Sequence, residues 1–285
     1  MTTLFDESLS VRSSFRTGGS ADILLIPESE EELVAALEEY KNKQSVVVLG
    51  NITNTLITDR GVRGCVILTA GLKGIALSGN IITAQSGVDM SRLAGFALEN
   101  SLTGGEFLYG IPGTVGGGVV MNAGAYGGEM KDIVESVKLY SPEKGIFTLK
   151  RGEMGFGHRK SVVSDSNLVV LSSSFVLEKG DRKAIKAKME EYMATRRAKQ
   201  PLEYPSCGSV FKRPAGFFAG KLIEDCGLKG FSVGGAKVSE KHAGFIINAA
   251  SATSSDMLKI IKHIKETVFA KTGVVLEEEI KIIGE

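Results

Sequence analysis

The sequence predicts a folded protein in which helices and strands alternate, divided into two parts near residue 200. Helical and strand-like hydrophobic patterns follow one another along both parts of the chain. The 285 residues are 43% hydrophobic, and a chain of this size buries about three-quarters of its unfolded surface, which allows one or two sizeable cores. With only 6 Pro and no Gly-X-Y period, disordered, collagen-like and coiled-coil structures are excluded.

The first part begins with a helical pattern from Pro27 to Tyr40. Ser29 and Glu32 have the spacing of a capping box, and the apolar residues fall on one face. A run at 46–49 predicts a buried strand that enters a loop at Gly50. The remaining predicted elements are a helix at 90–100 and strands at 65–69, 81–84, 134–140, 145–150 and 168–177. An amphipathic helix at 181–199 closes this part, because Pro201 cannot continue it.

The second part has its own series of elements. We expect a helix at 220–226, a strand at 244–248 and a helix at 255–271 that Ser254 or Ser255 caps and Gly273 ends. In the last strand, period two places Leu276, Ile280 and Ile282 on one face. Glu277 and Glu279 then share the opposite, polar face, and the pattern alone does not choose between them as functional residues.

Charge and targeting signals exclude several partners. With 34 Lys and Arg against 33 Asp and Glu, the chain has no strongly basic field for a nucleic acid or an anionic membrane. It contains no transmembrane-length apolar run and no signal-peptide pattern, so we expect a cytoplasmic protein. Three cysteines without CxxC spacing indicate buried reduced thiols and no metal site.

Glycine is concentrated in one stretch. Ten of the 35 glycines lie between Gly104 and Gly128. Glycine allows positive φ and lets a ligand approach the main chain, so consecutive amides can converge on a diphosphate; tight turns and close backbone packing are the alternative. The stretch matches neither a Rossmann nor a Walker motif. A second candidate loop runs from Leu49 to Gly61, although a polar turn is the better explanation of this segment taken alone.

Short segments spread along nearly the whole chain carry a family resemblance. They are Phe15–Asp22, Glu106–Phe107, Gly110–Gly117, Asn122–Gly127, Phe156–Ser161, Gln200–Pro201, Pro205–Lys212, Ala219–Glu224, Gly227–Gly230, Ser239–His242 and Leu276–Ile280. In this order they resemble the UDP-N-acetylenolpyruvylglucosamine reductase family, flavoenzymes that complete UDP-N-acetylmuramate in peptidoglycan (cell wall) synthesis. The compact length resembles the shorter class, which lacks an inserted substrate loop.

The resemblance implies an α+β fold. A two-part FAD-binding region of the vanillyl-alcohol-oxidase type would occupy residues 1–200, with lobes at about 1–68 and 69–200, and a smaller α+β substrate-binding domain would occupy residues 201–285. It also implies noncovalent FAD, NADPH as reductant, a small-molecule substrate and, as the default, a monomer. FAD would contact Gly50, Asn51, Ile52, Thr53, Asn54, Gly110, Ile111, Pro112, Gly113, Thr114, Gly116, Gly117, Asn122, Ala123 and Gly124.

The reaction that the resemblance implies moves a hydride from NADPH to the flavin and then to C3 of an enolpyruvyl group, with a proton added at C2. Negative charge develops beside a carboxylate, so a fixed cation and a proton donor are required. Arg159, Ser209 and Glu279 match the family's catalytic positions. Lys212, Arg213 and His242 are expected to contact the substrate.

The chain departs from the family pattern at four positions. Ile52 replaces the second glycine of the first loop, Arg213 replaces an Asn, Glu278 replaces a Pro and His158 replaces a Tyr. Two alternatives remain open at this stage: another flavoenzyme of the same superfamily acting on a sugar or hydroxy acid, and a nonenzymatic module that binds a nucleotide sugar.

Overall fold

The computed structural model describes residues 1–285, which form two compact units. The first unit contains residues 1–4, 24–51 and 65–196, and the second contains residues 5–23, 52–64 and 197–285. The strands β1 (Thr2–Ser8), β2 (Ser20–Ile26) and β5 (Val62–Leu68) and the helix α5 (Arg182–Lys199) each cross from one unit to the other. Each unit is described below by itself.

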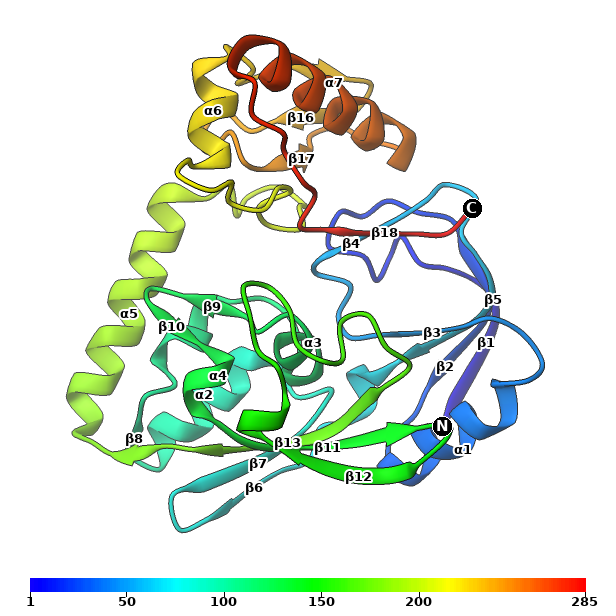
Figure 1. The fold of residues 1–285 in the computed structure, drawn as a ribbon, viewed down its shortest axis with the longest axis vertical. Coiled ribbons are helices and arrows are strands. Elements are labelled where there is room, and N and C mark those ends of the chain that lie inside the picture. Colours follow the sequence, from blue (N-terminus) through cyan, green and yellow to red (C-terminus); the bar gives the residue numbers. More distant parts are fainter. The chain divides into compact units, whose positions relative to one another are not determined.

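The first unit is built on a five-stranded antiparallel sheet in the order β12-β11-β13-β7-β6. Figure 1 shows α2, α3 and α4 on one side of this sheet, and α3 packs on β13 and β7. The sheet strands are β6 (Ile75–Ser78), β7 (Ile81–Gln85), β11 (Val134–Ser141), β12 (Gly145–Lys150) and β13 (Val169–Val176). The helices are α1 (Glu30–Tyr40), α2 (Met90–Glu99), α3 (Val115–Val120) and α4 (Met130–Ile133).

Shorter elements complete this unit. The parallel pair of β3 and β5 lies at the edge of a sheet ordered β1-β2-β5-β3. The glycine-rich hairpin of β9 and β10 follows α3. The bounds are β3 (Val46–Leu49), β8 (Leu102–Thr103), β9 (Gly124–Ala125), β10 (Gly128–Glu129), β14 (Glu178–Lys179), η1 (Thr69–Gly71), η2 (Glu106–Gly110) and η3 (Arg151–Glu153).

The second unit combines a three-stranded antiparallel sheet with two helices. The strand order is β15-β16-β17, and α7 packs on β15 and β16 while α6 contacts α7. The last strand, β18, pairs in parallel with β4 from the N-terminal third of the chain. The bounds are β4 (Thr55–Ile57), α6 (Ala219–Asp225), β15 (Ser232–Val233), β16 (Ala236–Val238), β17 (Ile246–Asn248), α7 (Ser254–Thr272) and β18 (Lys281–Ile283).

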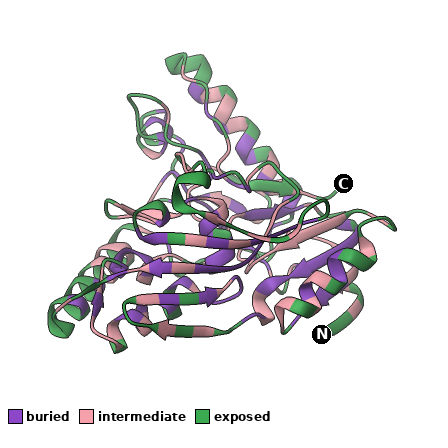
Figure 2. Ribbon diagram, turned by 60° about the horizontal axis from the view of Figure 1, so that its bottom comes forward, coloured by how far each residue is buried: buried purple, intermediate pink, exposed green.

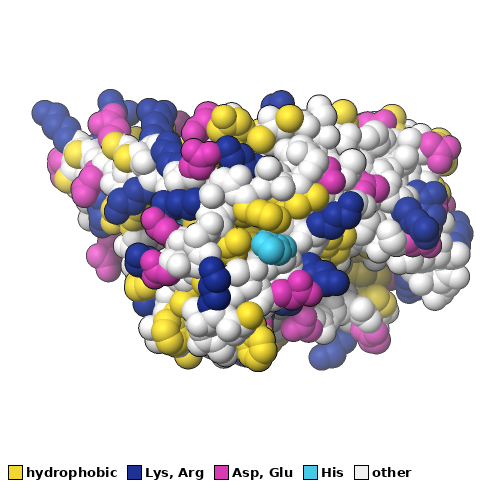
Figure 3. Space-filling view, turned by 90° about the horizontal axis from the view of Figure 1, so that it is seen from above, with side chains coloured by type: hydrophobic (Ala, Val, Ile, Leu, Met, Phe, Trp, Pro, Cys, Tyr) yellow, Lys and Arg dark blue, Asp and Glu magenta, His cyan; other side chains and the backbone are white.

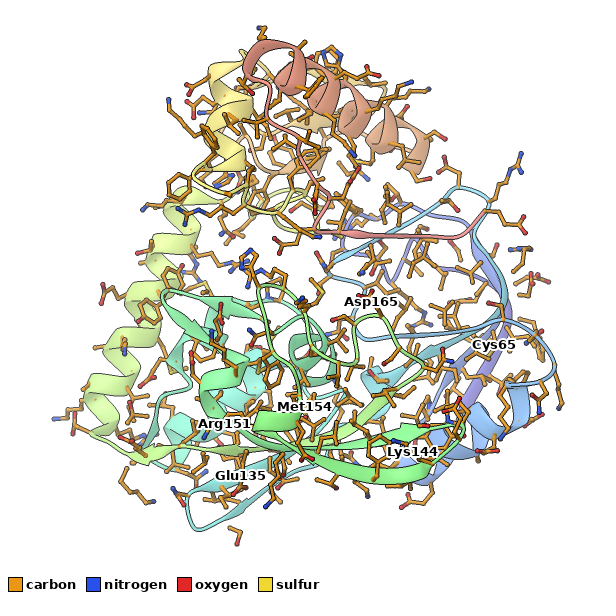
Figure 4. The ribbon with its side chains drawn as sticks, viewed as in Figure 1. Cys65, Glu135, Lys144, Arg151, Met154 and Asp165 are labelled. Carbon is orange, nitrogen blue, oxygen red and sulfur yellow. The ribbon has the colours of Figure 1, made fainter.

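Each unit has its own apolar core. Met154, labelled in Figure 4, is fully buried in the core of the first unit with residues from the five-stranded sheet and from α2, α3 and α5. The core of the second unit contains the inward faces of α6 and α7 and the strands beneath them. Figure 2 shows buried positions alternating with more exposed ones along strands, the period that the sequence analysis used.

The cysteines and the surface agree with the sequence. All three cysteines are buried free thiols. Acidic and basic side chains are mixed on the face shown in Figure 3. No helix in the structure combines the length and the apolar character needed to cross a membrane.

Most predicted elements are confirmed to within a few residues, but details at their ends were wrong. The Ser29 hydroxyl caps α1, whereas the Glu32 carboxylate accepts from Glu28 N–H, one residue before the position that a capping box requires. Thr253, rather than Ser254 or Ser255, is the N-cap of α7. The alternation of the last strand fails at Ile282, which is 45% exposed, and the paired strand β18 covers only Lys281–Ile283.

Other differences reflect pairing that the sequence does not display. The strand at 46–49 is half-buried rather than buried, because it lies at a sheet edge. The sequence analysis missed β1, β2, β4, β6, β15 and β16, the two-residue strands β8, β9, β10 and β14, and the short helices α3 and α4.

The capping box of α7 supports a stability prediction. Thr253 Oγ1 accepts from Asp256 N–H, and the Asp256 carboxylate accepts from Thr253 N–H, both at 3.1 Å. We expect Thr253→Ala to lower the free energy of unfolding by about 1 kcal/mol, because the Asp256 amide loses its acceptor. Thr253→Ser keeps the hydroxyl and serves as the control in a urea titration. If the two variants were equally stable, Thr253 would not be the cap.

Candidate functional site

The two loops expected to bind FAD meet within the first unit. A Cβ on Gly50 would lie 2.4 Å from Oγ1 of Thr114, so the loops approach more closely there than any side chain allows. Asn51 Nδ2 donates to the Asp89 carboxylate at 2.6 Å, and Asp89 forms an isolated β-bridge with Thr114. Glycine at position 50 is therefore required by the contact between the loops.

Main-chain amides at this meeting point are available to a ligand. No acceptor in the protein pairs with the backbone N–H groups of Asn51, Gly113 or Thr114. Gly113 has a φ of 119°, a conformation that only glycine adopts readily. Unpaired amides beside bare glycine fit the diphosphate of FAD.

Not every glycine of the second loop faces a ligand. A Cβ on Gly116 would meet Ser86 Cβ at 2.8 Å, so close packing against Ser86 explains that glycine. Gly117 is exposed at the first turn of α3, and its amide donates to Thr114 Oγ1 at 3.3 Å. Gly110, Ile111 and Pro112 lead from η2 into this loop. Of the two glycine uses that the sequence left open, close packing therefore occurs at Gly116, and ligand approach to this loop stays a prediction.

Ile52 occupies the position where the family pattern has glycine. Its φ is 49°, so the backbone adopts the left-handed conformation that a glycine would take, at a steric cost for a β-branched residue. The side chain is only 3% exposed, and its carbonyl accepts from Ser14 N–H at 3.2 Å. Burial within the second unit thus holds the loop in the conformation that the missing glycine would have favoured.

Within the second unit, the end of the first loop reaches the proposed catalytic segments. Asn54 Nδ2 donates to the Glu279 carbonyl at 3.1 Å. The Cys207 thiol, two residues before Ser209, lies 3.5 Å from the Thr55 carbonyl oxygen and 3.8 Å from that of Ile52. The structure therefore brings together Ile52, Thr53 and Asn54 with the segments that carry Ser209 and Glu279.

Ser209 and Glu279 come from strand-like segments that run side by side. Glu279 N–H donates to the Val210 carbonyl at 2.7 Å, and Phe211 forms a β-bridge with Glu278. Ser209 is bridged on its other side to Phe245. Both residues are half-buried, as expected for side chains that line a site.

The three consecutive glutamates, Glu277 to Glu279, have different environments in the structure. Glu277 is exposed and pairs with Lys212 at 3.1 Å, and Glu278 pairs with Lys265 of α7 at 2.8 Å. Glu278, where the family pattern has Pro, thus forms an ion pair that connects this segment to α7. Glu277 lies in an exposed surface ion pair, whereas Glu279 is half-buried beside the Ser209 segment.

The expected substrate contacts differ in environment. Lys212 is exposed and engaged with Glu277, and the exposed Arg213 guanidinium lies 3.8 Å from the centre of the Phe218 ring. His242 Nδ1 accepts from Gly244 N–H at 3.1 Å, which places the ring proton of the neutral form on Nε2. Burial lowers the pKa of His242, so this neutral form is favoured.

Cys207 has no nucleophilic role in this arrangement. It is 3% exposed, and burial raises the pKa of its thiol to about 12. A thiol with that pKa stays protonated near neutral pH. The expectation that Cys207 serves packing agrees with this environment.

Arg159 belongs to the first unit, on a tight turn between Gly157 and Lys160. Its φ is 55°, and its guanidinium donates to the Gly124 carbonyl at 3.4 Å. It borders a cavity of about 370 Å³ whose other lining residues include Ala125, Glu129 and His158. A cation beside a polar cavity can bind a carboxylate.

Gly124 also lines this cavity, and Asn122 and Ala123 come directly before it in the sequence. Asn122 is fully buried, and its side chain bonds only to protein groups. The sequence analysis did not find Glu129 and Asp89, the carboxylates that hold Asn122 and Asn51. Glu129 directly follows the glycine-rich stretch in the sequence, whereas Asp89 has no such signal.

Comparison with known proteins identifies the family. The family model "FAD binding domain" matches residues 21–149, and "UDP-N-acetylenolpyruvoylglucosamine reductase, C-terminal domain" matches residues 200–283. Proteins named UDP-N-acetylenolpyruvoylglucosamine reductase from Caldanaerobacter subterraneus and Geobacillus kaustophilus are 48% and 49% identical to this chain. These alignments cover 98% and 99% of the chain and 93% of each relative.

A solved structure supports the same assignment over the whole fold. The UDP-N-acetylenolpyruvylglucosamine reductase (MurB) of Thermus caldophilus has a TM-score of 0.86 and 32% identity, covering 99% of this chain and 98% of that one. The expected α+β fold, with an FAD-binding region followed by a smaller C-terminal domain, is thereby confirmed. The chain belongs to the UDP-N-acetylenolpyruvoylglucosamine reductase family.

Proposed function

We propose that this chain reduces UDP-N-acetylglucosamine enolpyruvate to UDP-N-acetylmuramate with FAD and NADPH, a step of peptidoglycan synthesis. The observation that carries the proposal is the match, along nearly the whole chain, to reductases of that name. Bound FAD would supply a hydride carrier between NADPH and C3 of the enolpyruvyl group. The protein must then hold the cofactor, bind the substrate carboxylate and deliver a proton to C2.

The amides of Asn51, Gly113 and Thr114 are assigned to the FAD diphosphate. They are unpaired within the protein and lie where the two glycine loops meet. Such amides provide fixed partial positive charge without a basic side chain, in keeping with the nearly neutral composition. We retain a boundary near Pro201 between this cofactor region and the substrate domain.

Arg159 is assigned to the substrate carboxylate. A guanidinium stays charged and presents two parallel donors, so it can bind the carboxylate while charge develops at the neighbouring C2. Its position on a polar cavity of the first unit supports this role. Preorganised cations of this kind stabilise a transition state because they need no rearrangement during the reaction.

Ser209 is assigned as the proton donor to C2, with Glu279 assisting. The pairing of Val210 with Glu279 keeps the two side chains on adjacent backbone segments of the second unit. Lys212, Arg213 and the neutral His242 are assigned to the rest of the substrate. We further propose that the enzyme is cytoplasmic and monomeric.

Turnover of the purified protein tests the function. We expect a yellow protein that oxidises NADPH only when the UDP-enolpyruvyl sugar is present. A nonenzymatic binding module would give no NADPH oxidation. Another flavoenzyme of the superfamily would turn over a sugar or hydroxy acid and ignore the enolpyruvyl compound, which would contradict the proposal.

Replacement of Ser209 tests the proton donor. Ser209→Ala is expected to slow reoxidation of the flavin by the enolpyruvyl sugar by about 100-fold or more, because C2 loses its donor. Loss of flavin absorbance on adding NADPH should stay unchanged, since that step needs no proton at C2. Stopped-flow absorbance measures both steps, and normal reoxidation in this variant would exclude the role.

The neighbouring glutamates provide a matched pair of variants. Glu279→Gln is expected to lower kcat by about 100-fold. Glu277→Gln removes only an exposed ion pair with Lys212, which contributes at most about 1 kcal/mol, and should leave kcat near the wild-type value. If the variants behaved in the opposite way, Glu277 would be the functional residue.

A further inference from the structure

Asn122 is the most completely bonded polar side chain near the cavity. It is 0% exposed, and its Nδ2 donates both to the Glu129 carboxylate and to the Gly157 carbonyl at 3.0 Å. Its Oδ1 accepts from Lys131 N–H at 3.0 Å. Both Nδ2 protons are bonded within the protein, and the fully buried side chain has no surface open to a ligand.

The Gly157 carbonyl belongs to the turn that carries Arg159. Gly157 and Lys160 pair through two backbone hydrogen bonds, and Val162 N–H donates to the buried Met154 carbonyl at 2.9 Å. Asn122 therefore ties the glycine-rich hairpin to the base of the turn. The Arg159 guanidinium reaches back to the same hairpin through Gly124.

Backbone conformation shows that these positions are held against a steric preference. Asn122, Tyr126 and Arg159 have φ values of 42°, 54° and 55°, the left-handed region that side chains rarely adopt. Such residues persist where surrounding contacts over-determine them. At the hairpin tip, Tyr126 stacks on Tyr192 of α5 with ring centres 4.2 Å apart and donates to its carbonyl at 2.8 Å.

The Glu129 carboxylate takes part both in the hydrogen bonds of Asn122 and in an ion pair. It accepts from Lys131 Nζ at 2.6 Å as well as from Asn122. The pKa of Glu129 is lowered despite partial burial. The main cause is the hydrogen bond from Lys131, and the hydrogen bond from Asn122 and the charge of Arg159 add to it. The carboxylate therefore stays ionised on the cavity wall and favours a positive group there.

We propose that Asn122 and Glu129 are positioning residues that hold the turn bearing Arg159, so that its guanidinium faces the substrate carboxylate. This inference rests on the proposed function of Arg159. The Asn122 side chain then serves the substrate step through Arg159, and only its main chain is left to contact FAD. Misplacement of a binding group by about 1 Å can slow a reaction by about 100-fold.

The test compares the two half-reactions in the FAD-loaded enzyme. Asn122→Gly removes the amide and tolerates the positive φ. We expect it to slow flavin reoxidation by the enolpyruvyl sugar by about 10- to 100-fold, with flavin reduction by NADPH changed less than about twofold. Asn100→Gly is the control, because Asn100 Nδ2 also donates to a backbone carbonyl, that of Phe96, outside the site.

A double-mutant cycle separates positioning from general support of the fold. In an Arg159→Met background, adding Asn122→Gly should change the reoxidation rate less than about twofold, since its effect passes through Arg159. Equal slowing in both backgrounds, or equal slowing of both half-reactions, would overturn the proposal. If Arg159→Met alone left reoxidation unchanged, the proposed function of Arg159 would fail instead.

A second pair of variants keeps the test decisive if Asn122→Gly does not retain FAD. Glu129→Gln preserves an oxygen that accepts from Asn122, whereas Glu129→Ala removes it. We expect Glu129→Ala to slow reoxidation by about tenfold and Glu129→Gln to recover most of that loss. Equal rates in the two variants would contradict the positioning role.

Discussion

The close approach of Gly50 to Thr114 is the constraint on which the cofactor region of the first unit depends. A Cβ at position 50 would lie 2.4 Å from Oγ1 of Thr114 and 3.3 and 3.4 Å from its two side-chain carbons, so the Thr114 side chain or the loops would have to shift. The contact joins two residues that are 64 positions apart in the sequence, and the amides of Asn51, Gly113 and Thr114 around it are unpaired. A nearly neutral chain obtains an anion site in this way from main chain alone.

Backbone strain marks the functional segments in both units. Of the eight non-glycine residues with positive φ, five lie in the first FAD-binding loop or in segments that carry the family resemblance: Arg16, Ile52, Asn122, Tyr126 and Arg159. Each such conformation costs of order 1 kcal/mol or more, so its surroundings must hold it in place. At Ile52, the side chain is buried and the carbonyl accepts from Ser14 N–H and the Cys207 thiol. These contacts hold the positive φ that a glycine would adopt without strain.

The sequence predicted the regular elements best where local signals were strong. The helix predicted at 181–199 is observed as Arg182–Lys199, because a long amphipathic period ends at a proline. Missed elements such as β4 depend on distant pairing, in this case with β18. The site residues Arg159, Ser209 and Glu279 were predicted from the family resemblance. The Lys212–Glu277 ion pair and the hydrogen bonds of Asn122 join residues that no sequence pattern connects, so only the structure shows them.

The affinity for FAD of a Gly50→Ala variant tests the central claim most directly. Gly95→Ala is the matched control, since a Cβ at that position in α2 would meet nothing within 4 Å. The account predicts that Gly50→Ala remains folded but weakens FAD binding by about tenfold or more, as an added Cβ forces the loops apart. Gly95→Ala should bind FAD like the wild type. A folded Gly50→Ala protein with wild-type FAD affinity would contradict the claim that this contact builds the cofactor site.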